Sequence, residues 1–273
     1  IYTLSLHDAL PIWSAGFWEA NMIDGKQTFQ HKREVTYSDI NNRGIVDAAS
    51  LVDYLQGIAI LHSDEIGYTT KWFLDNHLGW ALVGWNVNIY RNPLEKELLT
   101  IDTWTENYRR VQADRDFQIK DEKGCLILEA SSRWFLMDTE RRKPARLKEE
   151  FFSPYIFENS PPCAKQNYKI KVPGNISVTS ESVYTVIRRD TDTNNHAKNV
   201  VYIDWAMDSA PDNLYENYRI SQIKAVYKKE CYLGEQVKCT ALIDDTETYF
   251  IFTKLSEPEN VVCKIFILWQ EKD

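Results

Sequence analysis

Residues 188–205 read RRDTDTNNHAKNVVYIDW, a polar segment followed by an apolar run. The polar part places Asp190, Asp192, Asn194 and His196 at alternate positions. In an extended segment such side chains point to one side, so Asp192, Asn194 and His196 are predicted to converge. A carboxylate, an amide and an imidazole together supply a proton acceptor, a hydrogen-bonding group and a group that titrates near neutral pH. The alternative is that they only form a turn and a helix cap.

An earlier segment repeats this order of elements. Residues 39–43 read DINNR and match DTNNH at 192–196, an offset of 153 residues (192 minus 39). A strand is predicted before each turn (30–37 and 182–187) and an apolar helix after each (46–62 and from 200), with a short second helix at 70–76. Four strand-like runs follow in each half, at 80–90, 98–107, 111–120 and 125–137, and at 220–227, 236–244, 247–255 and 261–270. We therefore expect a duplicated α+β unit.

Two segments fall outside the repeats. The stretch at 3–12 resembles a reading frame of a common sequencing adapter, and we expect residues 1–21 to be a non-native extension with Met22 as the true start. Residues 138–178 are charged and proline-bearing with little periodicity, which predicts an interdomain connector that crosses the surface. The expected organisation is an N-terminal repeat at 22–137 and a C-terminal repeat at 179–273.

Composition argues against several classes of function. The 273 residues carry a net charge of −8, which is unfavourable for nucleic acid as the main partner. The ten glycines form no dinucleotide fingerprint, phosphate loop or G-x-S-x-G elbow. The five cysteines lack C-x-x-C spacing, so we expect no zinc or other metal site, reduced thiols and a cytoplasmic location. No apolar run is long enough to span a bilayer.

Two motifs in the second half resemble those of the acyl-acyl carrier protein thioesterase family. The segment DTNNH at 192–196 resembles the family's catalytic motif. The segment YKKEC at 227–231 resembles its second motif, which supplies a catalytic Glu and an adjacent Cys. The 34 residues from His196 to Glu230 also fit the family. The family often has Val-Asn directly after the histidine, where this chain has Ala197-Lys198, a departure at the start of the helix.

Motifs in the first half resemble the family's N-terminal repeat. They are LGW at 78–80, YR at 90–91, Trp104, RD at 115–116 and WFLM at 134–137. The resemblance implies two tandem hotdog repeats, each a buried helix wrapped by an antiparallel sheet. It also implies hydrolysis of fatty acyl-acyl carrier protein to free fatty acid and carrier, without a metal or organic cofactor.

The resemblance assigns roles to five residues of the second half. Asp192, Asn194, His196 and Glu230 are expected to be catalytic, with the general base left open among Asp192, Glu230 and His196. Asn194 is expected to orient the attacking water or the thioester carbonyl. Cys231 is an accessory residue. Its thiolate could attack the thioester directly, but a buried thiol that shapes the pocket, with water as the nucleophile, is the preferred hypothesis.

The first repeat is expected to lack an active site. At the offset of 153 residues, Arg43 stands where His196 does, and Pro93 lies near the position of Glu230. As the resemblance implies, this repeat is expected to supply the acyl pocket. The candidates for the pocket wall are Trp72, Phe73, Trp80 and Trp85.

The partner that the resemblance implies is a small acidic acyl carrier protein. On a chain of net negative charge, clustered basic residues are candidates for a local docking patch. They are Arg109, Arg110, Arg115, Arg141, Arg142, Arg188 and Arg189. For any single one of them, an ordinary solvated position is the alternative, and a homodimer is a further expected assembly.

Three other functions stay open from the sequence. The chain could be an acyl-CoA thioesterase, a hydratase or dehydratase, or a non-catalytic module that binds acyl chains, because fold alone does not decide the chemistry. Carrier-linked and CoA-linked donors distinguish the first, and enoyl substrates distinguish the second.

Overall fold

Two copies of one set of elements build the chain, within residues 28–157, 160–161 and 168–272 that the computed structural model describes. The first copy contains β1 (Phe29–Glu34), η1 (Tyr37–Asp39), α1 (Ala48–Glu65), α2 (Thr70–Asp75), β2 (Leu78–Ile89), β3 (Leu98–Arg109), β4 (Gln112–Lys120) and β5 (Leu126–Asp138). The second contains β7 (Val178–Thr185), η3 (Arg188–Asp190), α4 (Val201–Asp208), α5 (Asp212–Asn217), β8 (Tyr218–Tyr227), β9 (Gln236–Asp244), β10 (Glu247–Lys254) and β11 (Glu257–Glu271). The predicted duplication is confirmed.

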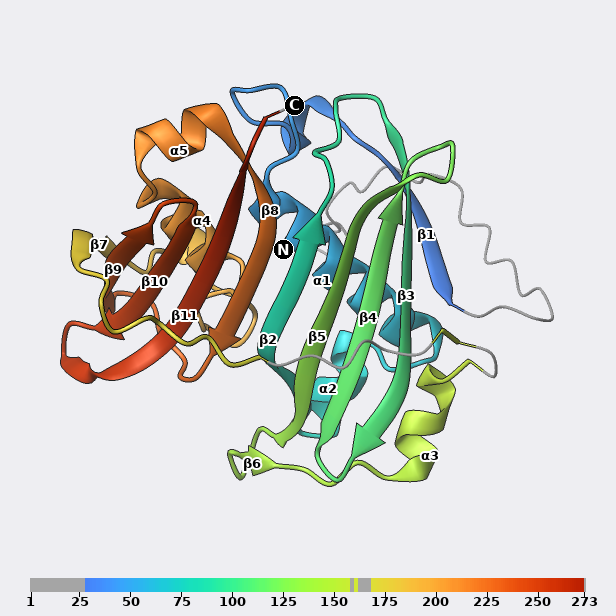
Figure 1. Ribbon diagram of the computed structural model, residues 1–273. Helices are drawn as coiled ribbons and strands as arrows, with labels where there is room; N and C mark the ends of the chain where they lie inside the picture. Colours follow the sequence, from blue (N-terminus) through green and yellow to red (C-terminus); the bar gives the residue numbers. More distant parts are fainter. Residues whose placement is uncertain (1–27, 158–159, 162–167, 273) are drawn as a thin grey trace, which may run out of the picture.

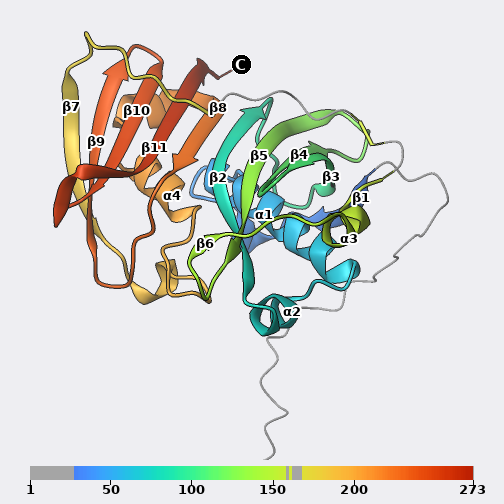
Figure 2. The same cartoon turned by 90° about the horizontal axis from the view of Figure 1, so that it is seen from below.

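The strands of both copies join one antiparallel sheet (Figure 1). Its order is β1-β3-β4-β5-β2-β8-β11-β10-β9-β7, so corresponding strands of the two repeats follow each other outward from the centre. The central pair is β2 with β8, where residues 84–88 pair with 222–226. Figure 2 shows the sheet curving around α1 in the first half and α4 in the second, on the same side of the sheet. Each half is therefore a helix wrapped by an antiparallel sheet, as predicted.

Helix α1 lies buried under the first half of the sheet. It begins after Asp47, whose Oδ1 accepts the backbone N–H of Ser50 at 2.8 Å and so satisfies a donor that the helix itself leaves unpaired. Leu51, Leu55 and Ile58 share one face and are buried, which is the spacing of an apolar helix face. Helix α1 has 18 residues and α4 has 8. The first repeat thus has the longer central helix, and one side of it lines the cavity described below.

The segment between the repeats contains structure that the sequence did not predict. Strand β6 (Lys143–Pro144) pairs with the end of β5, and α3 (Glu149–Phe152) and η2 (Ser153–Tyr155) follow. Phe152 and Tyr155 are buried against the first repeat. Burial of one such side chain contributes about 1.5–3 kcal/mol, so these two residues anchor the segment. The prediction of a connector that only crosses the surface is wrong here, because helices of 4 and 3 residues are too short to leave a periodic apolar pattern.

Candidate active site

The polar segment around Asp192 forms a tight hairpin. Thr191 pairs with Ala197 in an antiparallel bridge, and the backbone N–H of Asn195 donates to the carbonyl of Asp192 at 3.0 Å. Asn195 has a φ of +61°, in the left-handed region that Asn tolerates better than most residues. The segment is not an extended strand, so the predicted cause of convergence, alternation of side chains along a strand, is wrong. A turn brings the polar residues together.

The carboxylate of Asp192 holds this hairpin. Its Oδ1 accepts the backbone N–H groups of Asn194 at 2.8 Å and His196 at 3.0 Å. Such local bonds are the usual reason for Asp in turns. Both bonds end on Oδ1, and Asp192 also lines the cavity beside the hairpin. The turn role and the site role proposed from the sequence therefore apply to the same residue.

His196 and Glu230 meet at the end of the hairpin. The backbone of His196 pairs with that of Tyr232, which places the segment carrying Glu230 beside the imidazole. His196 Nε2 lies 3.4 Å from Glu230 Oε2. The ring of Tyr232 packs edge to face on the imidazole, with 5.0 Å between ring centroids. The structure thus brings together two of the three titratable residues that the sequence singled out.

Arg142, from the segment between the repeats, completes this cluster. It lies in the turn between β5 and β6, and its Nη2 donates to Glu230 Oε2 at 3.0 Å and to the Tyr232 hydroxyl oxygen at 3.0 Å. The Tyr232 O–H donates to the same Glu230 oxygen at 3.0 Å. The sequence placed Arg142 in the docking patch and did not single out Tyr232. No sequence signal identifies a contact between residues 88 positions apart.

Cys231 is a core residue. Its exposed fraction is 0%, it packs in the main apolar cluster, and it is not among the residues that line the cavity. Burial raises the pKa of the Cys231 thiol, so the thiolate is disfavoured at neutral pH. These observations favour water over Cys231 as the nucleophile, and the pocket-shaping role expected for Cys231 is replaced by packing in the core.

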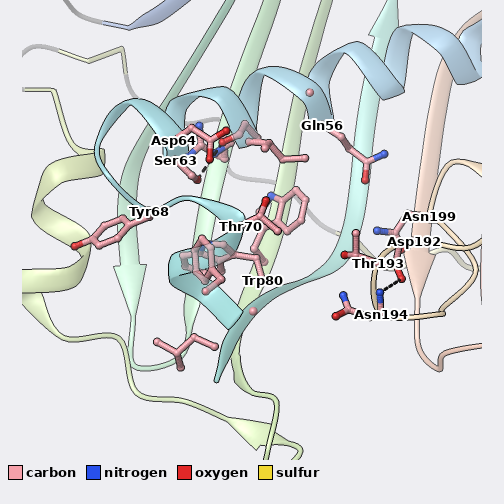
Figure 3. Close-up of a pocket in the computed structure, with 18 of the residues that line it drawn as sticks. Gln56, Ser63, Asp64, Tyr68, Thr70, Trp80, Asp192, Thr193, Asn194 and Asn199 are labelled. Atoms are coloured by element: carbon pink, nitrogen blue, oxygen red, sulfur yellow. Dashed lines mark hydrogen bonds between the residues drawn. The ribbon is translucent and has the colours of Figure 1, made fainter. Parts of the chain in front are cut away.

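A cavity of about 580 Å³ extends from the hairpin along α1 into the first repeat. Figure 3 shows Asp192, Asn194 and Asn199 at one end of it and Ser63 and Trp80 towards the other. Its volume falls in the range of small-molecule pockets, about 300–1,000 Å³. His196 and Glu230 are not among its lining residues, although His196 belongs to the hairpin that closes this end.

Two of the four predicted pocket aromatics line the cavity. Phe73 and Trp80 form a section of its wall. Trp85 has an exposed fraction of 0% and packs in the core against Phe117, so its prediction as a pocket residue is wrong. Trp72 stacks with Phe151 beside the cavity without lining it, so its prediction is wrong as well.

Arg115 is buried, so its prediction as a docking residue is wrong. It is 6% exposed and lines the cavity. Its Nη1 donates to His62 Nδ1 at 3.1 Å and to Thr103 Oγ1 at 3.1 Å. Because an arginine only donates, His62 carries its proton on Nε2. Burial, with a smaller effect of Arg115, lowers the pKa of His62 to about 2, so this imidazole is neutral.

The other basic candidates lie on the surface. Arg109 and Arg110 are exposed at the turn between β3 and β4. Arg141 pairs with Asp138 at 3.4 Å, and Arg188 and Arg189 are exposed on η3, directly before the hairpin. These positions are compatible with docking, which stays a prediction.

The first repeat has an equivalent hairpin in a register that the sequence match did not identify. Ile40 pairs with Val46 as Thr191 pairs with Ala197, an offset of 151 residues (191 minus 40). Gly44, with a φ of +71°, corresponds to the left-handed Asn195. The predicted offset of 153 is therefore wrong by two residues, because similar side chains occupy different turn positions in the two repeats.

In the correct register the first repeat lacks the titratable pair. Ile45 pairs with Leu94 as His196 pairs with Tyr232, so Ile45 stands in place of the histidine and Asn92 in place of Glu230. Arg43 corresponds to Asn194, not to His196. The expectation that the first repeat has no equivalent His–Glu pair holds, with different residues at those positions. Within the described residues, no three His, Cys, Asp or Glu side chains are grouped to hold a metal ion.

Comparisons with protein families and curated proteins agree along the chain. A family model described as the acyl-ACP thioesterase N-terminal domain matches residues 26–155, and another for the C-terminal domain matches 174–271. The oleoyl-acyl carrier protein thioesterase 2 of Arabidopsis thaliana is 26% identical over 200 residues, covering 67% of this chain and 54% of that protein. The palmitoyl-acyl carrier protein thioesterase of the same plant is 27% identical over 194 residues, covering 67% and 47%. The chain spans about half the length of these curated relatives.

Solved structures share the fold. An acyl-ACP thioesterase from Bacteroides thetaiotaomicron superposes with a TM-score of 0.76 at 23% identity, covering 89% of this chain and 98% of that chain. A 12:0-ACP thioesterase from Umbellularia californica gives a TM-score of 0.80 at 17% identity, covering 90% and 98%. The predicted tandem hotdog fold is confirmed. Of the helices in the described ranges of the chain, none is both long and apolar enough to cross a membrane.

Proposed function

This chain belongs to the acyl-ACP thioesterase family, and from that premise we propose that it hydrolyses fatty acyl-acyl carrier protein to free fatty acid and carrier protein. One observation carries the proposal. The hairpin of Asp192, Asn194 and His196, with Glu230 beside it, closes one end of a cavity whose remaining wall comes mainly from the first repeat. A site of this kind holds a chain in one repeat and cleaves its thioester at the other.

The proposed mechanism is attack by water. His196 and Glu230 form the proton-accepting pair, because a water held between the hairpin and this pair can pass its proton to either group. Asp192 fixes the hairpin through its two backbone bonds, so that Asn194 faces the cavity and orients the water or the thioester oxygen. Proton transfer and charge stabilisation each contribute roughly 10²–10⁴-fold in such sites.

The proposed acyl site is the cavity itself. Phe73 and Trp80 of the first repeat and Phe152 of the following segment give it an apolar wall, and Gln56 and Asn199 lie nearer the hairpin. An acyl chain that fills this space would place its thioester at Asn194. Burial of each methylene of the chain contributes about 0.8 kcal/mol, so the cavity wall is expected to set the preferred chain length.

The proposed partner is an acyl carrier protein that docks through exposed basic residues. The remaining candidates are Arg109, Arg110, Arg141, Arg188 and Arg189, since Arg115 is buried and Arg142 binds Glu230. A cytoplasmic location and a homodimer stay predictions. The cysteines in the described residues, Cys125, Cys231, Cys239 and Cys263, are free thiols, which is compatible with a reducing compartment.

The proposal is tested by measuring thiol release from a C8–C18 series of acyl-carrier and acyl-CoA thioesters, with wild type beside His196→Ala. We expect hydrolysis by wild type, a preference for the carrier-linked donor, and loss of roughly 10²-fold or more in the variant. A preference for the CoA-linked donor would favour an acyl-CoA thioesterase. Hydration of enoyl substrates without hydrolysis would favour a hydratase, and tight acyl binding without turnover would favour a binding module.

A further inference from the structure

We propose that Arg142 is a positioning residue for Glu230, through which the segment between the repeats completes the active site of the second repeat. The inference rests on the proposed thioesterase function and concerns the same site. Arg142 belongs to the β5–β6 turn, at the start of the segment between the repeats, whereas Glu230 and Tyr232 follow β8 of the second repeat. The catalytic cluster is thus assembled from the second repeat and the segment that joins it to the first.

The contacts converge on a single carboxylate oxygen. Glu230 Oε2 accepts from Arg142 Nη2 at 3.0 Å and from the Tyr232 hydroxyl at 3.0 Å, and it lies 3.4 Å from His196 Nε2. Arg142 Nη2 also donates to the Tyr232 hydroxyl oxygen at 3.0 Å, so each of the three side chains is hydrogen-bonded to the other two. Charged hydrogen bonds of this kind fix geometry strongly. With Oε2 engaged three times, Oε1 is the oxygen left to meet a water.

The turn that carries Arg142 is itself fixed. Asp138 Oδ1 accepts the backbone N–H of Arg141 at 2.8 Å, and Asp138 and Met137 pair with Lys143 and Pro144 of β6. Arg142 has a φ of +52°, in the left-handed region that non-glycine residues adopt at a cost. The paired turn thus fixes the backbone from which the Arg142 side chain extends towards Glu230.

A stabilising role does not account for this contact. The side chains of Arg142 and Glu230 are 72% and 48% exposed, and ion pairs at such exposure contribute little to folding. Their effect is on orientation. Without Arg142, the Tyr232 hydroxyl is the remaining donor to Glu230 Oε2, so the carboxylate is held less firmly beside His196 and the base of the proposed mechanism loses alignment.

The experiment compares Arg142→Ala with wild type on a carrier-linked thioester and on a carrier-free acyl-pantetheine of the same chain length. We expect kcat to fall roughly 10–100-fold on both substrates, with KM little changed, because a misplaced catalytic group slows the chemical step. Arg142→Lys should recover some of the loss, and added guanidinium ion should partly restore Arg142→Ala through the exposed site. The matched control is Arg146→Ala, which removes the same side chain from an exposed position four residues further along.

A double-mutant cycle separates positioning from other roles. If Arg142 acts through Glu230, Arg142→Ala should add little to the loss already caused by Glu230→Gln. Additive losses, or a loss confined to KM for the carrier-linked substrate, would overturn the inference and make Arg142 a docking residue. Full activity of a folded Arg142→Ala on both substrates would overturn it as well. A wild type inactive on every thioester would overturn the proposed function, and the inference with it.

Discussion

Ile45 occupies, in the first repeat, the place that His196 occupies in the second. Both residues pair their backbone with the strand-end segment that follows the central strand, Ile45 with Leu94 and His196 with Tyr232. The two repeats therefore share this backbone pairing, but only the second has a titratable side chain at this position. An isoleucine can neither accept nor donate a proton, so the hairpin of the first repeat is a structural element, and we expect one active site per chain.

The preference for water as the nucleophile predicts that Cys231→Ala retains activity. The thiol is fully buried and burial raises its pKa, so it is a poor source of thiolate at neutral pH. Removing a buried atom leaves a small cavity, and we expect a loss of about 1 kcal/mol in the free energy of unfolding. Steady-state kinetics and chemical denaturation measure the two effects.

A folded Cys231→Ala protein without thiol release would contradict this prediction, as would an acyl group trapped on Cys231 by mass spectrometry. Cys239→Ala is the control, because Cys239 is equally buried and lies on β9.

Because His62 is buried and neutral, we predict that the free energy of unfolding decreases as the solution becomes acidic. In the unfolded chain its imidazole takes up a proton below about pH 6.5, whereas in the folded chain its pKa is lowered to about 2. Between these values the unfolded state binds more protons, so stability falls as pH falls, by about 1.4 kcal/mol per pH unit. From pH 6.5 to pH 5.0 the expected loss from His62 is about 2 kcal/mol.

Urea denaturation of wild type and His62→Gln at several pH values measures this contribution. Glutamine cannot titrate and keeps a carbonyl that can accept from Arg115. We expect the variant to lose about 2 kcal/mol less than wild type over that interval. Parallel pH dependence of the two proteins would show that His62 does not carry the effect.

Docking of an acidic carrier predicts a substrate-specific effect of the exposed pair Arg188 and Arg189. These residues lie directly before the catalytic hairpin, and reversing their charge opposes an acidic partner. The double change to Glu should raise KM roughly 10-fold for the carrier-linked donor at low salt and leave KM for acyl-CoA nearly unchanged. Kinetics at two ionic strengths give the result, since the effect should shrink as salt screens the charges. An equal loss on both donors would locate the damage in the hairpin itself.

The order of elements could be predicted because each element leaves a local pattern. The apolar spacing of α1 and the strand runs of both halves are visible within short windows, and two similar sets in the same order indicate a duplication. The register of the two turns could not be obtained by matching DINNR to DTNNH. The backbone equivalence follows the left-handed positions Gly44 and Asn195, which differ in side chain.

The site could be predicted only as far as its motifs are local. The hairpin of Asp192, Asn194 and His196 lies within one motif, and Glu230 lies in a second motif of known spacing. Arg142 reaches Glu230 from the segment between the repeats, and such a contact depends on how the two halves of the sheet are joined. The burial of Arg115 and Trp85 also depends on tertiary packing. For this reason the charge of Arg115 wrongly predicted a docking residue, and the aromatic ring of Trp85 wrongly predicted a pocket residue.

The difference between Trp80 and Trp72 predicts which residue controls chain length. Both belong to one aromatic cluster and both contact Phe151, but only Trp80 lines the cavity. Trp80→Ala should lengthen the space for the acyl chain and raise the kcat/KM ratio for a longer chain over a shorter one by roughly 10-fold or more. Trp72→Ala removes the same side chain beside the cavity and should leave that ratio near the wild-type value. Competition between C12 and C16 acyl-carrier thioesters measures both, and an equal shift in the two variants would mean that the acyl chain does not lie against Trp80.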